Sequence, residues 1–510
     1  MSFKRLLRRL RRPLAAASAV VLATAPAMAT WSICVIDVRT GEVVVAGATC
    51  IADFYLPQPI ACVAVGKGGG ASQSFVLHNA KGWMFEGFNN GDSPDQILTY
   101  IQANGTNLGV RQLGIVGLEG PPVTYTGNGC GDAATGAAGV VGDLRYAIQG
   151  NVLSDESVVF AAEEVLRNST GDLGQRVMLA METAAALGGD GRCSCPGSVP
   201  CGNPSGFTYS AYTSFLIVAR HGDTDSTTCA VTNNNCSNGD YYGLVHYEGN
   251  NTTPDPVDAL RRKYEIWRTG LSGRADHFLT QVSSTADILR ADGLDTATVD
   301  VALFDVEGQP VTVGGQTLVV TAVDDPGVTI SAVTDNGDGT HTFQVTGGTN
   351  PGAARLRVVV QDGVRDVQLW PDLEVQVAQP AELFHDRFEL SASAGGLVRF
   401  DIETPSNPGG TFQLLGSGSG TDPGTPFGSL TVPLVRDRLF ELCLSQPNGL
   451  VLPASQGVLD TAGEATAWFD AAPGVLSEWV GRRLDFVVFQ AGAPGASDRV
   501  TNGVFFEVVP

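Results

Sequence analysis

The hydrophobic pattern of this chain changes between residues 271 and 282, and the change limits the folds that the chain can adopt. Before it, β-branched runs that indicate strands alternate with segments whose apolar residues recur every three or four positions, a mixture typical of domains that combine helices with sheets. After it, the helical spacing disappears, and short apolar runs are separated by Gly, Asn, Asp and Pro. We therefore predict an α+β domain followed by all-β domains.

We predict four parts in the 510 residues of the chain. Residues 1–29 are a signal peptide, residues 30–271 an α+β domain, and residues 282–378 and 385–510 two β-sandwich domains. A hydrophobic content of 43% provides core material for about two to four domains.

The α+β domain is expected to begin with a hairpin. A strand at 30–38 is joined through a turn at 39–41 to a strand at 42–49. Both faces of the first strand carry apolar side chains, so we expect a central strand that is covered on both sides. Ser93 followed by Pro94 indicates the start of a helix. The expected helices are 94–103, 154–168, 172–187 and 256–269, and the expected later strands are 212–219 and 242–247.

Residues 1–29 have the parts of an export signal. A basic stretch precedes an apolar segment that ends at Ala27-Met28-Ala29, the small-residue pattern that signal peptidase recognises. We expect a secreted, periplasmic or cell-surface protein whose mature chain begins at Thr30. No later segment is apolar for long enough to span a membrane.

The charge of the chain excludes some partners. The formal net charge is −22, and residues 1–29 contain six basic and no acidic side chains, so the mature chain is more acidic still. Such a chain repels phosphate backbones and anionic lipid surfaces. We expect no nucleic-acid partner.

The cysteines fit an exported protein. Cys193, Cys195, Cys201, Cys229 and Cys236 lie in a stretch rich in Gly, Ser, Asn and Pro, which we interpret as a loop stapled by disulfides. A zinc site is the alternative, because closely spaced sulfurs also suit zinc. Disulfides are favoured, since no histidine lies at ligand spacing and export favours oxidation.

Signal cleavage at Ala29 would give Thr30 a chemical role. A threonine with a free α-amino group carries a nucleophile and a base on one residue. The amine has an ordinary pKa of roughly 7.7 to 8.0, so it can accept the hydroxyl proton near neutral pH. The alternative is an ordinary threonine that follows the cut. The six histidines are scattered and no Gly-x-Ser-x-Gly occurs, and we expect no metal and no cofactor.

The later domains carry turn and module patterns. Residues 335–340 predict a hairpin turn between strands at 328–333 and 341–345, and the loop lacks the glutamate that an EF-hand calcium site requires. Residues 286–301 resemble the opening of bacterial immunoglobulin-like modules, and residues 414–426 are similar to a C-terminal module of exported proteins. The resemblance implies β-sandwiches that space, attach or display other domains.

Several short motifs follow one another in the α+β domain. They are Thr30-Trp31-Ser32-Ile33, residues 37–42, residues 111–114, Thr126-Gly127 with Cys130, residues 149–151, residues 188–192 and residues 255–262. In this order they resemble the domain of unknown function family 1028, which is placed in the N-terminal-nucleophile (Ntn) hydrolase superfamily. The resemblance implies a four-layer αββα sandwich whose first strand delivers its terminal residue to a cleft between the sheets.

The resemblance also implies site residues. Thr30 is the expected catalytic nucleophile, and Asn151 is expected to donate a hydrogen bond to the oxyanion, with a turn asparagine as the alternative. Gln73 and Thr49 are expected to bind substrate in the cleft, with ordinary strand residues as the alternative.

Asp190 and Arg192 match a family motif, and we expect a charged pair that binds substrate beside the site. A turn aspartate is the alternative. Cys130 is conceivable as a nucleophile, although a disulfide or a buried thiol is favoured. Two departures from the family pattern stand out: residues 250–253 replace an Asp-Asp-His stretch, and the cysteine-rich insertion follows Arg192.

Two function classes follow. The first is an exported Ntn-type amidohydrolase in which Thr30 cleaves an amide bond of a peptide, an acylated small molecule or a cell-wall stem peptide. The alternative is a non-catalytic surface or extracellular binding protein for peptidoglycan or glycans, which keeps the Ntn-like fold as a scaffold. The expected partner is thus an amide-containing substrate or a cell-wall or extracellular polymer, and the oligomeric state stays open.

Overall fold

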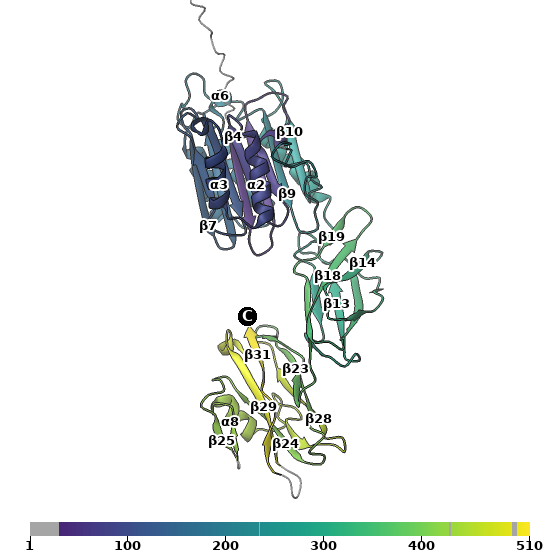
Figure 1. The fold of residues 1–510 in the computed structure, drawn as a ribbon. Helices are drawn as coiled ribbons and strands as arrows, with labels where there is room; N and C mark the ends of the chain where they lie inside the picture. The colour runs from purple at the N-terminus through teal and green to yellow at the C-terminus, as the bar shows by residue number, and fades with distance from the viewer. Residues whose placement is uncertain (1–29, 234, 428–429, 492–496) are drawn as a thin grey trace, which may run out of the picture. The chain divides into compact units, whose positions relative to one another are not determined.

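The computed structural model describes residues 30–233, 235–427, 430–491 and 497–510. The predicted signal peptide at 1–29 lies outside these residues. The chain divides into two compact units: the first contains residues 43–218 and 225–261 together with the strand that starts at Thr30, and the second contains residues 262–510 together with 39–42 and 219–224. The prediction of an α+β region followed by β-sheet regions is confirmed (Figure 1).

A six-stranded sheet in the first unit is built around the strand that begins at Thr30. Strand β1 (Thr30–Asp37) pairs antiparallel with β2 (Val43–Thr49) on one side and with β8 (Leu144–Asn151) on the other. Nearly all residues of β1 are buried, as predicted for a central strand. The sheet order is β10-β9-β2-β1-β8-β7, with β7 at Thr135–Val141, β9 at Thr213–Ala219 and β10 at Gly243–Glu248.

A four-stranded sheet packs against one face of this sheet. Its order is β3-β4-β5-β6, and β1 contacts both β4 and β5. Gly69 in β4 permits the close approach, because a Cβ there would lie 2.7 Å from Cγ1 of Val43 in the facing sheet. The strand bounds are Ala61–Ala64, Gly68–Ser74, Arg111–Gly117 and Val123–Thr126.

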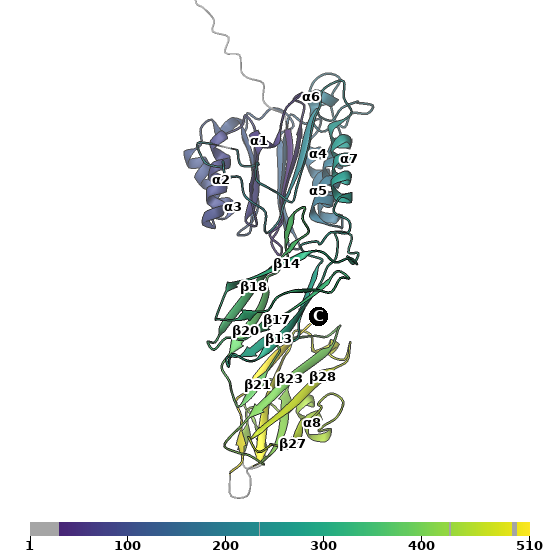
Figure 2. The ribbon, with the colours of Figure 1, turned by 90° about the vertical axis from the view of Figure 1, so that its right-hand side faces the viewer.

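Helices cover the outer face of each sheet in the first unit. Helices α2 (His78–Asn90) and α3 (Pro94–Asn104) contact the four-stranded sheet, and α4 (Ser157–Asn168) and α5 (Leu173–Ala186) contact the six-stranded sheet. Figure 2 shows the two sheets between these two pairs of helices. The described residues of this unit also include the short α1 (Pro57–Ile60), η1 (Leu108–Val110) and α6 (Gly191–Ser194), and α7 (Pro256–Thr269) begins in it.

The helix starts follow from local capping. Helix α3 begins as predicted, because Ser93 and Gln96 form a reciprocal capping box and Pro94 occupies the first turn. Helix α4 begins three residues later than predicted. The carboxylate of Asp155 accepts a hydrogen bond from the Ser157 amide, so the backbone turns there before the helix starts.

The second unit is dominated by antiparallel strands around two hydrophobic cores. One core is drawn from residues between Ala275 and Val375, and the other from residues between Leu383 and Val508. The hairpin predicted at 335–340 is present, with Thr334 opposite Thr342 and Asp335 opposite His341. The longest strands are β13 (Thr296–Ala302), β14 (Thr317–Asp324), β17 (Thr340–Thr346), β18 (Gly352–Gln361), β23 (Gly396–Glu403), β24 (Thr411–Ser417), β28 (Glu464–Ala471) and β29 (Arg483–Ala491).

One element corrects the all-β prediction for 385–510. Helix α8 (Arg438–Ser445) lies in this region, and Asp437 caps it by accepting hydrogen bonds from the amides of Leu439 and Phe440. Leu439, Phe440 and Cys443 are buried on one face. The helix is only eight residues long, so its periodicity is too short to distinguish it from a strand in the sequence.

Candidate functional site

Three predicted site residues meet at one end of the six-stranded sheet. Thr30 is the first residue of β1, and it lies opposite Thr49 of β2 and opposite Asn151 of β8. Directly opposed residues in antiparallel strands point to the same face of a sheet. All three residues are buried. Asn151 is the last residue of β8.

Gln73 reaches the same place from the facing sheet. Its side-chain amide nitrogen donates to the main-chain oxygen of Thr30 over 2.8 Å and to the Oε1 of Gln112 over 2.8 Å. Its own Oε1 accepts from the Ser32 hydroxyl at 2.6 Å. Gln73 therefore fixes the backbone of Thr30 from the opposite sheet.

Three residues of this polar cluster belong to motifs noted in the sequence, but no site role was predicted for them. Ser32 accepts a hydrogen bond from Gln149 at 2.5 Å, and Gln112 donates to the main-chain oxygen of Gly150 at 2.8 Å. Ser32, Gln149 and Gln112 are all buried, together with Gln73. The signal available was a polar residue inside an otherwise apolar strand, as Ser32 is in β1.

Asp190 and Arg192 form the predicted charged pair. The Arg192 guanidinium contacts both carboxylate oxygens, with Nε 3.1 Å from Oδ1 and Nη2 2.8 Å from Oδ2. Asp190 also caps α6, accepting from the Arg192 amide at 3.0 Å. A two-point contact of this kind fixes the plane of the guanidinium as well as its position.

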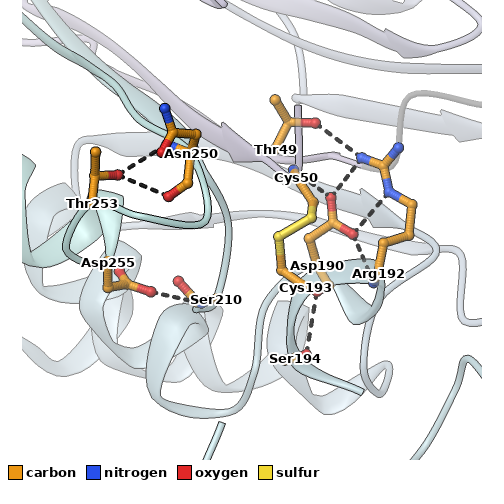
Figure 3. The surroundings of a disulfide bond; sticks show 10 residues. All are labelled: Thr49, Cys50, Asp190, Arg192, Cys193, Ser194, Ser210, Asn250, Thr253 and Asp255. Atoms are coloured by element: carbon orange, nitrogen blue, oxygen red, sulfur yellow. Dashed lines mark hydrogen bonds and ion pairs between the residues drawn. A yellow bond between two sulfur atoms is a disulfide. The ribbon is translucent and has the colours of Figure 1, made fainter. Parts of the chain in front are cut away.

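The charged pair is connected to the strand that faces Thr30. Arg192 Nη2 donates to the hydroxyl of Thr49 at 3.3 Å, and the amide of Cys50 donates to Asp190 Oδ2 at 2.7 Å (Figure 3). Asp190 is fully buried, and this burial raises the pKa of its carboxyl against the opposing influence of Arg192 and of the Cys50 and Arg192 amides. The charged pair therefore contacts the end of β2, where Thr49 lies directly opposite Thr30.

The predicted stapling of the cysteine-rich loop by disulfides is confirmed. Two disulfides close short loops, Cys195 to Cys201 and Cys229 to Cys236. The third joins Cys50 to Cys193 across 143 residues of sequence and was not predicted. In the part of the chain that the structure describes, no group of three or more His, Cys, Asp or Glu side chains is arranged to hold a metal ion.

Cys130 is a buried thiol next to this site. Its Sγ donates to the main-chain oxygen of Arg111 at 3.2 Å, and Asn151 Nδ2 lies 3.5 Å from the Cys130 main-chain oxygen. Burial raises the pKa of the Cys130 thiol. A thiol in this state is a weak nucleophile.

Residues 250–253, which replace the Asp-Asp-His stretch of the family pattern, form a hydrogen-bonded turn. Asn250 Oδ1 accepts from the Thr252 amide at 2.9 Å, and Asn250 Nδ2 donates to Asp53 at 3.0 Å. Asp255 accepts from the Ser210 amide at 2.6 Å (Figure 3). The side chains of this turn hold neighbouring loops together.

A family model matches the part of the chain that carries this site. Residues 30–198 match the model of a family of unknown function (DUF1028). This segment is a DUF1028 domain. It contains every predicted site residue, from Thr30 to Arg192. A second model, invasin domain 3, matches residues 279–370, which overlaps most of the immunoglobulin-like region predicted at 282–378.

Solved structures similar to this chain include a DUF1028 protein and adhesins. A DUF1028 protein from Silicibacter pomeroyi is 17% identical, with 47% of this chain and 88% of that chain covered and a TM-score of 0.34. The adhesin InvE of Yersinia pseudotuberculosis is 20% identical, with 45% and 58% covered and a TM-score of 0.18. The Escherichia coli adhesin FdeC is 11% identical, with 94% and 97% covered and a TM-score of 0.19. Likenesses with TM-scores this low support no inference about this chain.

Curated proteins include no sequence that matches the chain. Among the helices of the described residues, none has the length and apolar character needed to cross a bilayer.

Proposed function

We propose that the mature chain is an exported N-terminal-nucleophile amidohydrolase, with Thr30 as its nucleophile after residues 1–29 are removed. The observation that carries the proposal is the position of Thr30. It begins the central strand of its sheet, with Thr49 and Asn151 directly opposite on the neighbouring strands. The order helix, sheet, sheet, helix in the DUF1028 domain supports its assignment to the Ntn superfamily, and the disulfides support export.

The chemistry uses groups on the first residue and its neighbours. The α-amine of Thr30 accepts the hydroxyl proton as Oγ attacks the amide carbonyl, and the Asn151 side-chain amide donates to the oxyanion that forms. The protonated amine then gives its proton to the leaving nitrogen, and an acyl ester on Thr30 remains. Water, activated by the same amine, hydrolyses this ester and restores the hydroxyl.

The proposal makes cleavage a condition of activity. Removal of residues 1–29 creates the α-amine on which this chemistry depends.

The experiment is to sequence the N-terminus of the exported protein and to treat it with an electrophilic probe for terminal threonine. We expect the chain to begin at Thr30 and the adduct to form there. Thr30→Ser should still be labelled, because it keeps both reacting groups, whereas Thr30→Ala should fold and remain unlabelled. A mature chain that begins elsewhere, or labelling that persists in Thr30→Ala, excludes Thr30 as the nucleophile.

The match of residues 279–370 to an invasin domain favours a second candidate function. In it, the chain is a surface or extracellular binding protein for peptidoglycan or glycans, and the DUF1028 domain is a scaffold. The test is sedimentation of the full mature chain with purified sacculi. Binding by both wild type and Thr30→Ala, with no probe adduct on either, supports this candidate, and absence of sedimentation contradicts it.

A further inference from the structure

A disulfide joins the end of β2, the strand next to Thr30, to helix α6, which carries Arg192. Cys50 directly follows Thr49 at the end of β2, and Cys193 directly follows Arg192 in α6. Figure 3 shows the bond beside the contacts between Asp190, Arg192 and Thr49. The disulfide thus joins the residue after Thr49 to the residue after Arg192, the side chain that donates a hydrogen bond to Thr49.

The segment that carries Arg192 has little stability of its own. Helix α6 has four residues, and a single helical turn is not stable in isolation. It is held to β2 through Cys50 twice, by the sulfur bond to Cys193 and by the Cys50 amide that donates to Asp190 at 2.7 Å. Its backbone is also held after β8, where the Gly191 amide donates to the main-chain oxygen of Val152 at 3.0 Å. Because the two cysteines are 143 residues apart in sequence, chain connectivity alone does not keep these segments together.

Arg192 is ion-paired with the Asp190 carboxylate, and of these two groups it is the Arg192 guanidinium that contacts the side chain opposite Thr30. Its Nη2 lies 3.3 Å from the Thr49 hydroxyl, and Thr49 is directly opposite Thr30. Opposed Cβ atoms in antiparallel strands are about 4.5 to 5.5 Å apart. A nearby cation disfavours the protonated form of an amine and favours its neutral, basic form.

We propose that the disulfide between Cys50 and Cys193 is a positioning element of the Thr30 site, which holds the Arg192 guanidinium against Thr49 and thereby keeps the Thr30 amine uncharged. The proposal deepens the hydrolase function and rests on it for the role of the amine. Arg192 and both cysteines act through Thr30 and contact no reacting atom in this scheme.

The test measures the pKa of the Thr30 amine in the full mature chain, residues 30–510. The rate of acetylation by acetic anhydride is followed against pH, with the N-terminal peptide read by mass spectrometry. In Cys50→Ser/Cys193→Ser we expect the midpoint to move up by about one pH unit, which is a tenfold loss of neutral amine below the midpoint. Arg192→Gln should give the same shift, and Arg192→Lys should restore most of the wild-type midpoint.

The controls separate positioning from general stabilisation. Cys229→Ser/Cys236→Ser removes a disulfide that lies outside α6 and should leave the midpoint unchanged. Adding Arg192→Gln to Cys50→Ser/Cys193→Ser should give no further shift, because both changes remove one interaction. An unchanged midpoint in Arg192→Gln overturns the proposal, and so does an unchanged midpoint in a folded Cys50→Ser/Cys193→Ser.

The same samples distinguish this proposal from the hydrolase function. Acetylation reports the amine whether or not the hydroxyl reacts, whereas the electrophilic probe reports the hydroxyl. If the midpoints shift as expected but the wild type takes no probe adduct, the positioning stands and the hydrolase function fails. If the probe labels Thr30 at equal rates in wild type and in the variants at pH 7, the positioning proposal fails alone.

Discussion

Buried polar side chains between the two sheets hold the start of β1 in place. Gln73 takes part in four hydrogen bonds, to Ser32, to Gln112 and to the main-chain oxygens of Thr30 and Gln149. In an apolar interior each such group costs free energy when its partner is lost. The polar cluster therefore ties the geometry of Thr30 to the packing of both sheets.

Gln73→Leu should destabilise the DUF1028 domain. The change leaves buried polar atoms of Ser32 and Gln112 without this partner, and we expect the free energy of unfolding to fall by about 2 to 4 kcal/mol. Urea unfolding of the full chain measures the loss. Gln102→Leu, on the exposed side of α3, is the control and should change little. Equal stability of the two variants would contradict the role given to the cluster.

His277 makes the second unit sensitive to acid. Burial lowers the pKa of this histidine to about 3, below its ordinary 6.5, so the unfolded chain binds the proton more readily than the folded chain. The stability that the neutral form of His277 contributes is complete above about pH 7 and is lost as the pH falls. At pH 5 we expect a loss of about 2 kcal/mol from this residue.

Unfolding at pH 7 and at pH 5 measures this effect. His277→Gln should lose about 2 kcal/mol less than the wild type over this interval, because its side chain does not titrate. His78→Gln changes an exposed histidine in the first unit and should keep the wild-type difference. A His277→Gln protein with the full wild-type loss would show that another group is responsible.

Among the helices, α3 begins where the sequence predicts, because local capping sets its start. In α3 the Ser93 hydroxyl accepts from the Gln96 amide, and the Gln96 side chain accepts from the Ser93 amide at 2.8 Å. In α6 and α8 an aspartate has the capping role, but both helices are short and lack a periodic signal. Capping therefore predicts a boundary reliably only where a longer amphipathic segment follows it.

Ser93→Ala should weaken the start of α3. Loss of the cap leaves an amide in the first turn without its acceptor, and we expect about 1 kcal/mol less stability for the first unit. Thermal unfolding measures the change. Thr99→Ala, at an exposed position of the same helix, keeps the cap and is the matched control. A smaller loss for Ser93→Ala than for Thr99→Ala would contradict this account.

At the scale of the whole molecule, distant segments of the sequence belong to one compact unit. Residues 39–42 and 219–224 lie in the second unit, with residues 262–510. Arg220 connects them: its Nε is 2.6 Å from Glu42 and its Nη1 is 2.7 Å from Asp276, and all three side chains are buried. Burial alone would raise the pKa of Asp276, but Arg220 and the Phe278 amide together outweigh it and hold this pKa below its ordinary value.

Arg220→Met should destabilise the second unit strongly. The substitution leaves the carboxylates of Glu42 and Asp276 buried without their cation, and breaking a buried ion pair in this way costs about 3 to 5 kcal/mol. Calorimetry should show a lower transition temperature. Arg436→Met removes an ion pair with Glu441 in which both side chains are about half exposed, and it should cost less than 1 kcal/mol. Similar losses in the two variants would show that the buried ion pairs do not stabilise the unit.

The sequence by itself determined the features that depend on neighbouring residues. These are the hairpin of β1 and β2, the capped start of α3, the helix at Pro256–Thr269 and the turn at 335–340. The hairpin also places Thr49 beside Thr30, since a short turn sets the register of the strands that it joins. The predicted domain boundaries, and the roles of the site residues, stay predictions.

Only the tertiary structure decided the features that join distant segments. It placed Asn151 opposite Thr30, brought Gln73 from the facing sheet, and paired Cys50 with Cys193. Strand order and disulfide pairing across more than a hundred residues depend on how all the apolar faces are buried together. How these faces pack together is a property of the whole folded chain, and no local pattern of residues predicts it.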